Sequence, residues 1–390
     1  MTPPAPRHLS RSLTTVIAVA NGVIVADLYY LQPLLHQLRG DFGLTASAAS
    51  LLVTLLQLGY AGGLVLVAPL GDRVGRRHLA VGVYLVAALS MAGGALAPTY
   101  AALVPLALVI GVASVGAQVL IPLAADLADP GQRGRVLARV MSGLLLGVLL
   151  SRTASGLIAQ ALGWRAVFGF AALALVLTAA VLWRVLPDEA PKPRVAYRHL
   201  VAGSFRLLAS QPGLRRRAWY GALIFAAISL TWTEIAFHLS AAPFHYSKAV
   251  IGLFGLFGVA GVLAANVAGH HADRRRERGS TVVAASAITA SFLVLLAGGS
   301  LVALGAGLVL LDAGMQGMQI TNQSIIYRLV PDSRGRATSA YMTCSFLGAA
   351  AGSLVGGLVY QRAGWTGVCW TGVAIGCGLL APALGARRAP

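Results

Sequence analysis

The feature that most constrains the fold is a succession of apolar runs, each long enough to cross a membrane. A transmembrane helix needs about 20 mostly apolar residues, and the chain contains twelve such runs. Charged residues make up only 11% of the chain, whereas a soluble domain has about 25%. We therefore expect an all-α membrane protein with twelve transmembrane helices. The runs lie near 12–35, 47–69, 79–97, 101–126, 137–161, 165–187, 217–240, 249–269, 280–299, 301–327, 338–361 and 364–385.

A constant offset of 201 residues relates the two halves of the chain. It carries Asp72-Arg73 onto Asp273-Arg274 and Gly163-Trp164 onto Gly364-Trp365. Landmarks that recur at one fixed shift indicate two copies of one structural unit. The sequence therefore predicts two pseudo-symmetric halves of six helices each.

The longest break between apolar runs separates these halves. Residues 187–194 are rich in proline and charge, which is typical of a linker. Residues 197–209 mix arginine with apolar side chains and predict a short helix on the inner membrane surface. We expect an N-terminal half over 1–187, a cytoplasmic linker over 188–216 and a C-terminal half over 217–390.

The distribution of positive charge predicts the orientation. Most of the 30 Lys and Arg residues lie at the termini and in the turns on one side of the membrane. Only Arg39, Arg165, Lys248 and Arg362 lie in the turns on the other side. The positive-inside rule then places both termini in the cytoplasm of a multi-pass inner-membrane protein. The placement of basic residues on the cytoplasmic side of the lipid bilayer thus accounts for the net charge of +18. We expect no nucleic-acid partner.

The cysteines and glycines predict packing roles. Cys344, Cys369 and Cys377 lie in apolar runs without metal-ligand spacing, so we expect no metal and no cofactor. Gly348, Gly352, Gly356 and Gly357 follow the small-residue spacing that allows close approach of helices. We expect a monomer.

Ionisable side chains inside apolar runs are costly and usually mark a transport pathway. Four occur here, and we expect them to take part in proton coupling: Asp27, Arg152, Glu234 and Asp312. Asp312 also begins a polar stripe. Gln316, Gln319 and Gln323 follow it at helical spacing and share its face. The stripe must face protein or water, so it lines either a central cavity or a hydrogen-bonded seam between helices.

Other polar side chains in the spans are further candidates for substrate binding. Glu234 and His238 are one turn apart and could share a proton at the site or at its mouth. Gln118 is the counterpart of Gln319 under the 201-residue offset, and packing remains an alternative for it. The remaining candidates are Asn21, Tyr30, Gln32 and Trp232.

The charged turn after the second run resembles the signature of the major facilitator superfamily. The matching residues are Asp72, Arg73, Gly75, Arg76 and Arg77. The resemblance implies that this turn, with Asp273 and Arg274 in the second copy, forms a conformational latch on the inner side. Asp27-Leu-Tyr-Tyr-Leu-Gln-Pro33 looks like a bacterial, efflux-like branch of the family.

The resemblance implies a secondary transporter, and we expect export of small organic molecules by proton antiport. An importer of the same fold and a non-transporting receptor remain alternatives. An enzyme is not expected, because the sequence has no HExxH motif and no phosphate-binding glycine loop.

Asp27 and Arg152 lie at similar depths of the first and fifth runs, which the family fold places side by side. We expect them to form a charge pair, either for coupling or as a static bridge.

Overall fold

A computed structural model describes residues 10–129, 131–188, 197–258 and 277–385. Within these ranges the chain is helical and contains no strand. The elements up to the predicted linker are α1 (Arg11–Ala26), η1 (Gln32–Leu34), α2 (Leu35–Asp41), α3 (Ala46–Leu66), η2 (Ala68–Asp72), α4 (Arg76–Leu96), α5 (Tyr100–Ala113), α6 (Gly116–Leu127), α7 (Arg133–Leu162) and α8 (Trp164–Val185). The later elements are α9 (Tyr197–Ser210), α10 (Pro212–Ser240), α11 (Lys248–Leu253), α13 (Glu277–Leu295), α14 (Leu301–Leu329), η3 (Pro331–Ser333) and α15 (Arg334–Gly385).

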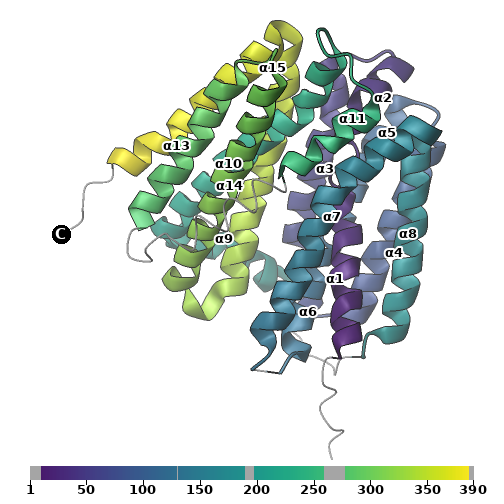
Figure 1. The fold of residues 1–390 in the computed structure, drawn as a ribbon. Coiled ribbons are helices and arrows are strands. Elements are labelled where there is room, and N and C mark those ends of the chain that lie inside the picture. The colour runs from purple at the N-terminus through teal and green to yellow at the C-terminus, as the bar shows by residue number, and fades with distance from the viewer. Residues whose placement is uncertain (1–9, 130, 189–196, 259–276, 386–390) are drawn as a thin grey trace, which may run out of the picture.

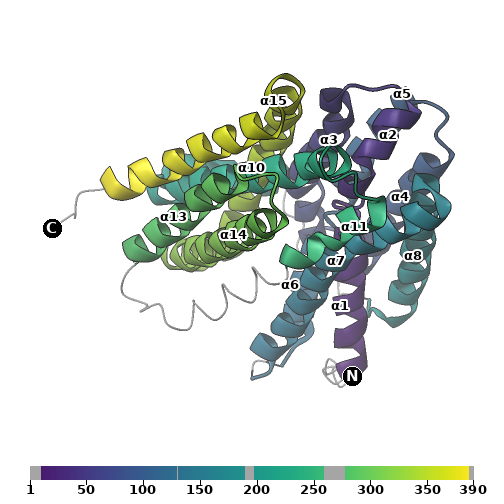
Figure 2. The ribbon, with the colours of Figure 1, turned by 45° about the horizontal axis from the view of Figure 1, so that its top comes forward.

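The helices form two groups that lie beside each other (Figure 1). One group contains α1–α8, and the other contains α10, α13, α14 and α15. Helix α11 crosses to the first group and packs against α7. In Figure 2 the same division is seen after rotation of the view. Nine helices of the described ranges are long and apolar enough to cross a membrane, which fits the expected all-α membrane fold.

Helix starts follow the sequence closely. Hydroxyl side chains cap five helices by accepting a hydrogen bond from the backbone two or three residues into the helix. These caps are Ser10, Thr45, Thr99, Ser247 and Ser300.

The first predicted run is not one continuous helix. Helix α1 ends at Ala26, and residues 27–31 form turns before η1. Pro33 has no backbone N–H and so removes a helical hydrogen bond at this point. Ser155 on α7 donates a 2.7 Å hydrogen bond to the Tyr30 carbonyl. The break therefore places the Asp27–Pro33 segment against α7.

Close helix contacts repeat in the two groups. A Cβ on Gly147 of α7 would lie 2.2 Å from the Gly22 carbonyl oxygen of α1. A Cβ on Gly348 of α15 would lie 2.1 Å from the Ala222 carbonyl oxygen of α10. Gly352 approaches Ala226 in the same way. This confirms the packing role predicted for Gly348 and Gly352. Gly147 and Gly348 are 201 residues apart, and each packs against the backbone of a neighbouring helix in its own group.

The glycines of the two repeated Gly-Trp pairs both have a positive φ angle. Gly163 has φ 84° at the start of α8, and Gly364 has φ 58° at a kink within α15. Both values lie in the left-handed region that favours glycine. The following residues, Trp164 and Trp365, are buried. Each glycine thus turns the chain so that an aromatic ring enters its group of helices.

Candidate functional site

Arg152 of α7 lies at the centre of a buried cluster between the two groups of helices. Its Nε donates a 2.7 Å hydrogen bond to Oε1 of Gln32 in η1. Its guanidinium carbon lies 4.2 Å from the ring centroid of Trp232 on α10 and 4.9 Å from that of Tyr29. Only 5% of Arg152 is exposed. A planar cation stacked on aromatic rings while donating to an amide is stably held in such an environment.

Asp312 of α14 brings negative charge to the same cluster. Arg152 and Asp312 interact electrostatically, although no direct salt bridge joins them. The side chain of Trp232 lies near the Asp312 carboxylate, and its ring lies against Arg152. Trp232 therefore contacts a cation from one group of helices and an anion from its own group.

Two glycines make room for this cluster. A Cβ on Gly255 would lie 3.0 Å from Cβ of Arg152. A Cβ on Gly258 would lie 3.3 Å from Oδ2 of Asp312. Since both contacts are tight, a side chain at either position would crowd the charged residue that the segment after α11 covers.

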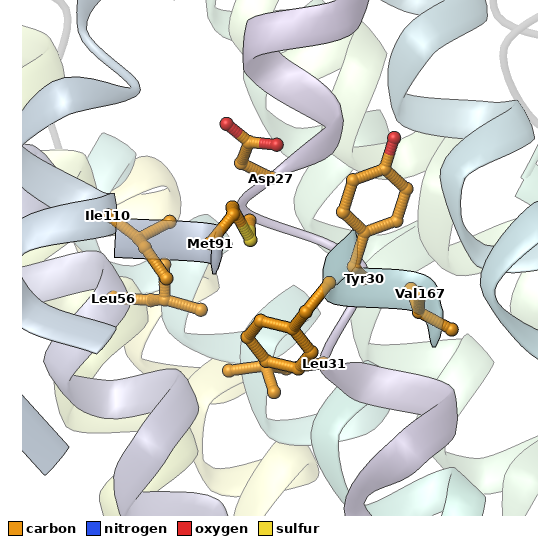
Figure 3. A pocket seen from close by; sticks show the side chains of 8 residues that line it. Asp27, Tyr30, Leu31, Leu56, Met91, Ile110 and Val167 are labelled. Carbon is orange, nitrogen blue, oxygen red and sulfur yellow. The ribbon is translucent and has the colours of Figure 1, made fainter. Parts of the chain in front are cut away.

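The expected pair between Asp27 and Arg152 is wrong. Both carboxyl oxygens of Asp27 are buried and have no hydrogen-bond partner among the described residues. Asp27 instead lines a cavity of about 10 Å³ with Tyr30, Met91 and Val167 (Figure 3), roughly the size that one water molecule needs. The break after Ala26 turns Asp27 toward α4 and α8, while Gln32 receives Arg152.

Glu234 of α10 accepts a hydrogen bond from the other group of helices. Ser50 of α3 donates a 2.8 Å hydrogen bond to its Oε1. Its Oε2 is buried without a partner in the described ranges. Further hydroxyl and amide contacts continue this seam, with Thr54 and Ser353 oxygens 2.8 Å apart and Gln57 donating to Ser229 over 2.8 Å.

His238 does not share a proton with Glu234 by a hydrogen bond. Its Nε2 lies 2.9 Å from the Gly298 carbonyl oxygen. Its ring stacks on Trp365 at 4.6 Å with an interplanar angle of 8°. The suggested link between the two side chains is therefore wrong, because Trp365 and Gly298 hold His238 toward α13 and the next turn.

The glutamine candidates differ in their surroundings. Gln316, Gln319 and Gln323 are half-buried and make no side-chain hydrogen bond within the part of the chain that the structure describes. Gln118 donates a 3.2 Å hydrogen bond to the Tyr60 hydroxyl, and the Tyr60 ring lies 4.2 Å from that of Phe346 on α15. Gln118 thus lies beside a contact between the two groups.

Asn21 does not face these side chains. It is fully buried, and its Nδ2 donates a 2.9 Å hydrogen bond to the Ile17 carbonyl of its own helix. It lies close to the contact between α1 and α7. This environment favours a packing role over the substrate contact that we expected.

The arginines of the charged turn bind acids near the ends of neighbouring helices. Arg76 lies 2.6 Å from Asp126 at the end of α6, and Arg77 lies 2.7 Å from Asp188. Arg73 is exposed, and Gly75 precedes the first residue of α4. Asp273 and Arg274 lie outside the described residues. Whether the turn acts as a latch between the two halves stays a prediction.

Several polar residues at these contacts escaped prediction from the sequence. Ser50, Thr54, Gln57 and Ser229 are common residues in apolar runs, and no motif marks them. Tyr29 could have been suspected from the sequence, because it adjoins the candidate Tyr30 in the Asp27–Pro33 segment. No three His, Cys, Asp or Glu side chains gather as metal ligands in the described ranges.

The fold is that of a helical membrane protein, and comparison identifies its family. The model of the Major Facilitator Superfamily matches residues 17–353 and 241–390. The chain therefore belongs to this superfamily, and membrane transport is its class of function.

Curated relatives agree with this assignment. The chain is 45% identical over 372 residues to the uncharacterized transporter YgaY of Escherichia coli O157:H7, covering 95% of this chain and 94% of the relative. It is 35% identical to the protein named "Probable transporter SCO4007" of Streptomyces coelicolor, covering 92% and 84% of the two chains. The human organic anion transporter MFSD10 has a similar fold, with a TM-score of 0.70, 21% identity and coverage of 97% and 99%.

Proposed function

We propose that the protein exports a small organic molecule across the inner membrane in exchange for protons, by alternating access of its two halves. The resemblance of Asp27–Pro33 to an efflux-like branch supports the direction. The buried acids Glu234 and Asp312 support the coupling, because a carboxyl group at membrane depth is a natural proton carrier. Both termini face the cytoplasm in this proposal, and the protein acts as a monomer.

The observation that carries the proposal is the contact of Trp232 with both Arg152 and Asp312. Arg152 belongs to α7, whereas Trp232 and Asp312 belong to α10 and α14. A rocking movement between the two groups would separate the cation from the indole and the carboxylate. Binding of a proton at Asp312 would remove the charge that faces Arg152 and so favour that movement. Protonation and conformational change are thereby linked at one place.

The described conformation is closed at the end that carries α2 and α11, which we assign to the outer face. Ser47 of α3 donates a 2.6 Å hydrogen bond to Gln361 of α15, and Thr153 of α7 donates to the Gly252 carbonyl of α11 over 3.1 Å. The ribbons of the two groups diverge toward the opposite end (Figure 1). Glu234 and Ser50 lie just inside the closed end, where proton exchange would control its opening.

The substrate is proposed to bind between the two groups, below this closure. Gln316, Gln319 and Gln323 from α14 and Gln118 from α6 supply amide groups without demanding a fixed charge. Trp232, Gln32, Tyr30 and His238 are proposed to line the same pathway, although Tyr30 and His238 lie toward the sides of the cluster. The turn with Asp72 and Arg73 is proposed to latch the inner side in the alternate conformation.

The proposal is tested by a thermal-shift screen of small organic compounds on purified protein, followed by flux measurements in proteoliposomes. An imposed pH gradient should drive a bound compound against its own gradient, in the direction opposite to the protons. Asp312→Asn should abolish this accumulation but keep downhill exchange. Accumulation in the same direction as the protons would identify an importer, and binding without flux would identify a receptor.

A further inference from the structure

A cavity of about 350 Å³ lies where the linker helix α9 meets the start of α15, away from the buried cluster. It is lined by His199, Gly203, Arg206, Leu207 and Ser210 of α9 and by Ser333 and Arg336 at the start of α15. The volume falls in the range of small-ligand pockets. The cavity is therefore large enough for a small ligand, and its lining includes basic side chains.

Helix α9 presents this lining as one face. Residues 199, 203, 206 and 210 are spaced by four, three and four, so they lie along a single stripe. Leu208 packs against the apolar cluster around Leu214 and Tyr341. Since this contact fixes the helix, the basic stripe is held toward the cavity.

The cations around the cavity have unused hydrogen-bonding capacity. His199, Arg206 and Arg336 make no ion pair and no side-chain hydrogen bond with the residues that the structure describes. Other arginines near this end of the molecule do bind acids, as Arg76 and Arg77 show. A Cβ on Gly203 would lie 3.2 Å from Cδ of Arg336, so a side chain at position 203 would crowd this arginine.

The backbone at the start of α15 adds further donors. The helix begins at Arg334, directly after Ser333, and the first N–H groups of a helix have no partner within it. Such an end favours a bound anion. Two guanidinium groups, an imidazole and a helix start thus converge on one hollow.

We propose that this cavity binds a phosphate group, and that the phosphate belongs to the headgroup of an anionic phospholipid. Arginine binds phosphate oxygens through paired, charge-assisted hydrogen bonds, and basic pockets at the cytoplasmic side of transmembrane helices suit anionic headgroups. Phe205, 52% exposed beside Arg206, offers an apolar side chain for the lipid chains. This feature favours a lipid over free phosphate.

Helix α9, which lines the site, contacts both groups of helices. The Tyr197 hydroxyl donates a hydrogen bond to the Leu66 carbonyl of α3, while α9 packs against α15. A headgroup bound between α9 and α15 would therefore stabilise the connection between the two groups.

The test is titration of the full-length purified protein, in neutral detergent, with dihexanoyl phosphatidylglycerol below its critical micelle concentration. Parallel titrations use dihexanoyl phosphatidylcholine and inorganic phosphate. We expect phosphatidylglycerol to bind at least tenfold more tightly than either. Equal affinity for inorganic phosphate would reject the lipid but keep the phosphate site, and equal affinity for phosphatidylcholine would overturn the proposal.

Matched variants locate the binding. Arg206→Gln combined with Arg336→Gln should weaken phosphatidylglycerol binding about tenfold or more. Arg198→Gln combined with Arg139→Gln removes the same charge from exposed positions outside the cavity and should change affinity less than twofold. Gly203→Leu keeps every charge but places a bulky side chain in the cavity against Arg336, and it should also weaken binding about tenfold or more. Equal affinities in the cavity variant and the control variant would overturn the proposal.

Discussion

Arg152 is held by three side chains of different chemistry, and each contact requires a guanidinium group. Gln32 accepts from Nε, whereas Trp232 and Tyr29 lie against the planar face. A lysine ammonium cannot reproduce a planar stack and a directed Nε–H bond at once. The position thus depends on shape as well as on charge.

The first prediction follows from this dependence. Arg152→Lys keeps the charge but should reduce transport by about tenfold, with a smaller effect on the melting temperature. Flux in proteoliposomes and thermal melting measure the two effects. Arg139→Lys, at an exposed position of the same helix, is the control and should leave both unchanged. Normal flux in the Arg152 variant would show that charge alone is needed.

The second prediction concerns the lack of contact between Asp27 and Arg152. Asp27→Asn, Arg152→Gln and the double variant form a thermodynamic cycle, which can be measured by unfolding in detergent. Because the two side chains lie in different environments, their effects should add to within about 0.5 kcal/mol. Asp27→Asn alone should not destabilise the protein, since its carboxyl oxygens have no partner among the described residues. An interaction free energy above about 1 kcal/mol in this cycle would show that Asp27 and Arg152 do form a charge pair.

At the scale of the elements, glycine decides how closely the helices approach. The contacts of Gly147 with Gly22 and of Gly348 with Ala222 involve backbone atoms, which cannot move aside as a flexible side chain can. A methyl group there must push two helices apart. Gly147 and Gly348 are 201 residues apart, so both groups use a glycine at the corresponding position for close helix packing.

The third prediction tests this device with matched substitutions. Gly147→Ala and Gly348→Ala should each destabilise the protein by about 1–3 kcal/mol through overpacking. Gly62→Ala in α3 and Gly82→Ala in α4 are the controls, because nothing lies within 4 Å of a Cβ at either position. These controls should raise stability by up to about 1 kcal/mol, since alanine favours helix more than glycine. Similar melting temperatures in all four variants would contradict this explanation.

Sequence patterns predicted elements far better than contacts between them. Apolar runs predict membrane helices because lipid requires them, and the glycine spacing predicted close packing. The break after Ala26 was signalled only by Pro33. The partners of Arg152 depend on how α1, α7 and α10 are rotated about their axes, which no single run reveals. Asp27 and Arg152 were therefore recognised as unusual, but their pairing was predicted wrongly.

At the scale of the whole molecule, the closed end brings together positive charge from α2 in the first half of the sequence and from α11 in the second half. His36 and Arg39 lie on α2, and Lys248 begins α11. Partial burial, Arg39 and Lys248 all lower the pKa of His36. Arg39 lies on the same helix as His36 and stays beside it in any conformation, so only burial and the nearness of Lys248 depend on closure. Through these two causes, protonation of His36 opposes closure. The closed end is therefore most stable above the ordinary histidine pKa of about 6.5 and loses stability as the pH falls below it.

The last prediction is that acidic pH shifts the molecule away from this closed conformation through His36. Spin labels at Gly40 of α2 and Arg362 of α15, both exposed near this end, would report the distance between the two groups. The fraction of long distances should rise between pH 8 and pH 5.5 in the parent protein, because protonated His36 repels Lys248. It should rise much less in His36→Gln and in Lys248→Gln. His78→Gln, at the start of α4, is the control and should behave like the parent. A pH response that survives in His36→Gln would assign the effect to another group, and the buried carboxyl of Glu234 beside Ser50 would be the next position to test.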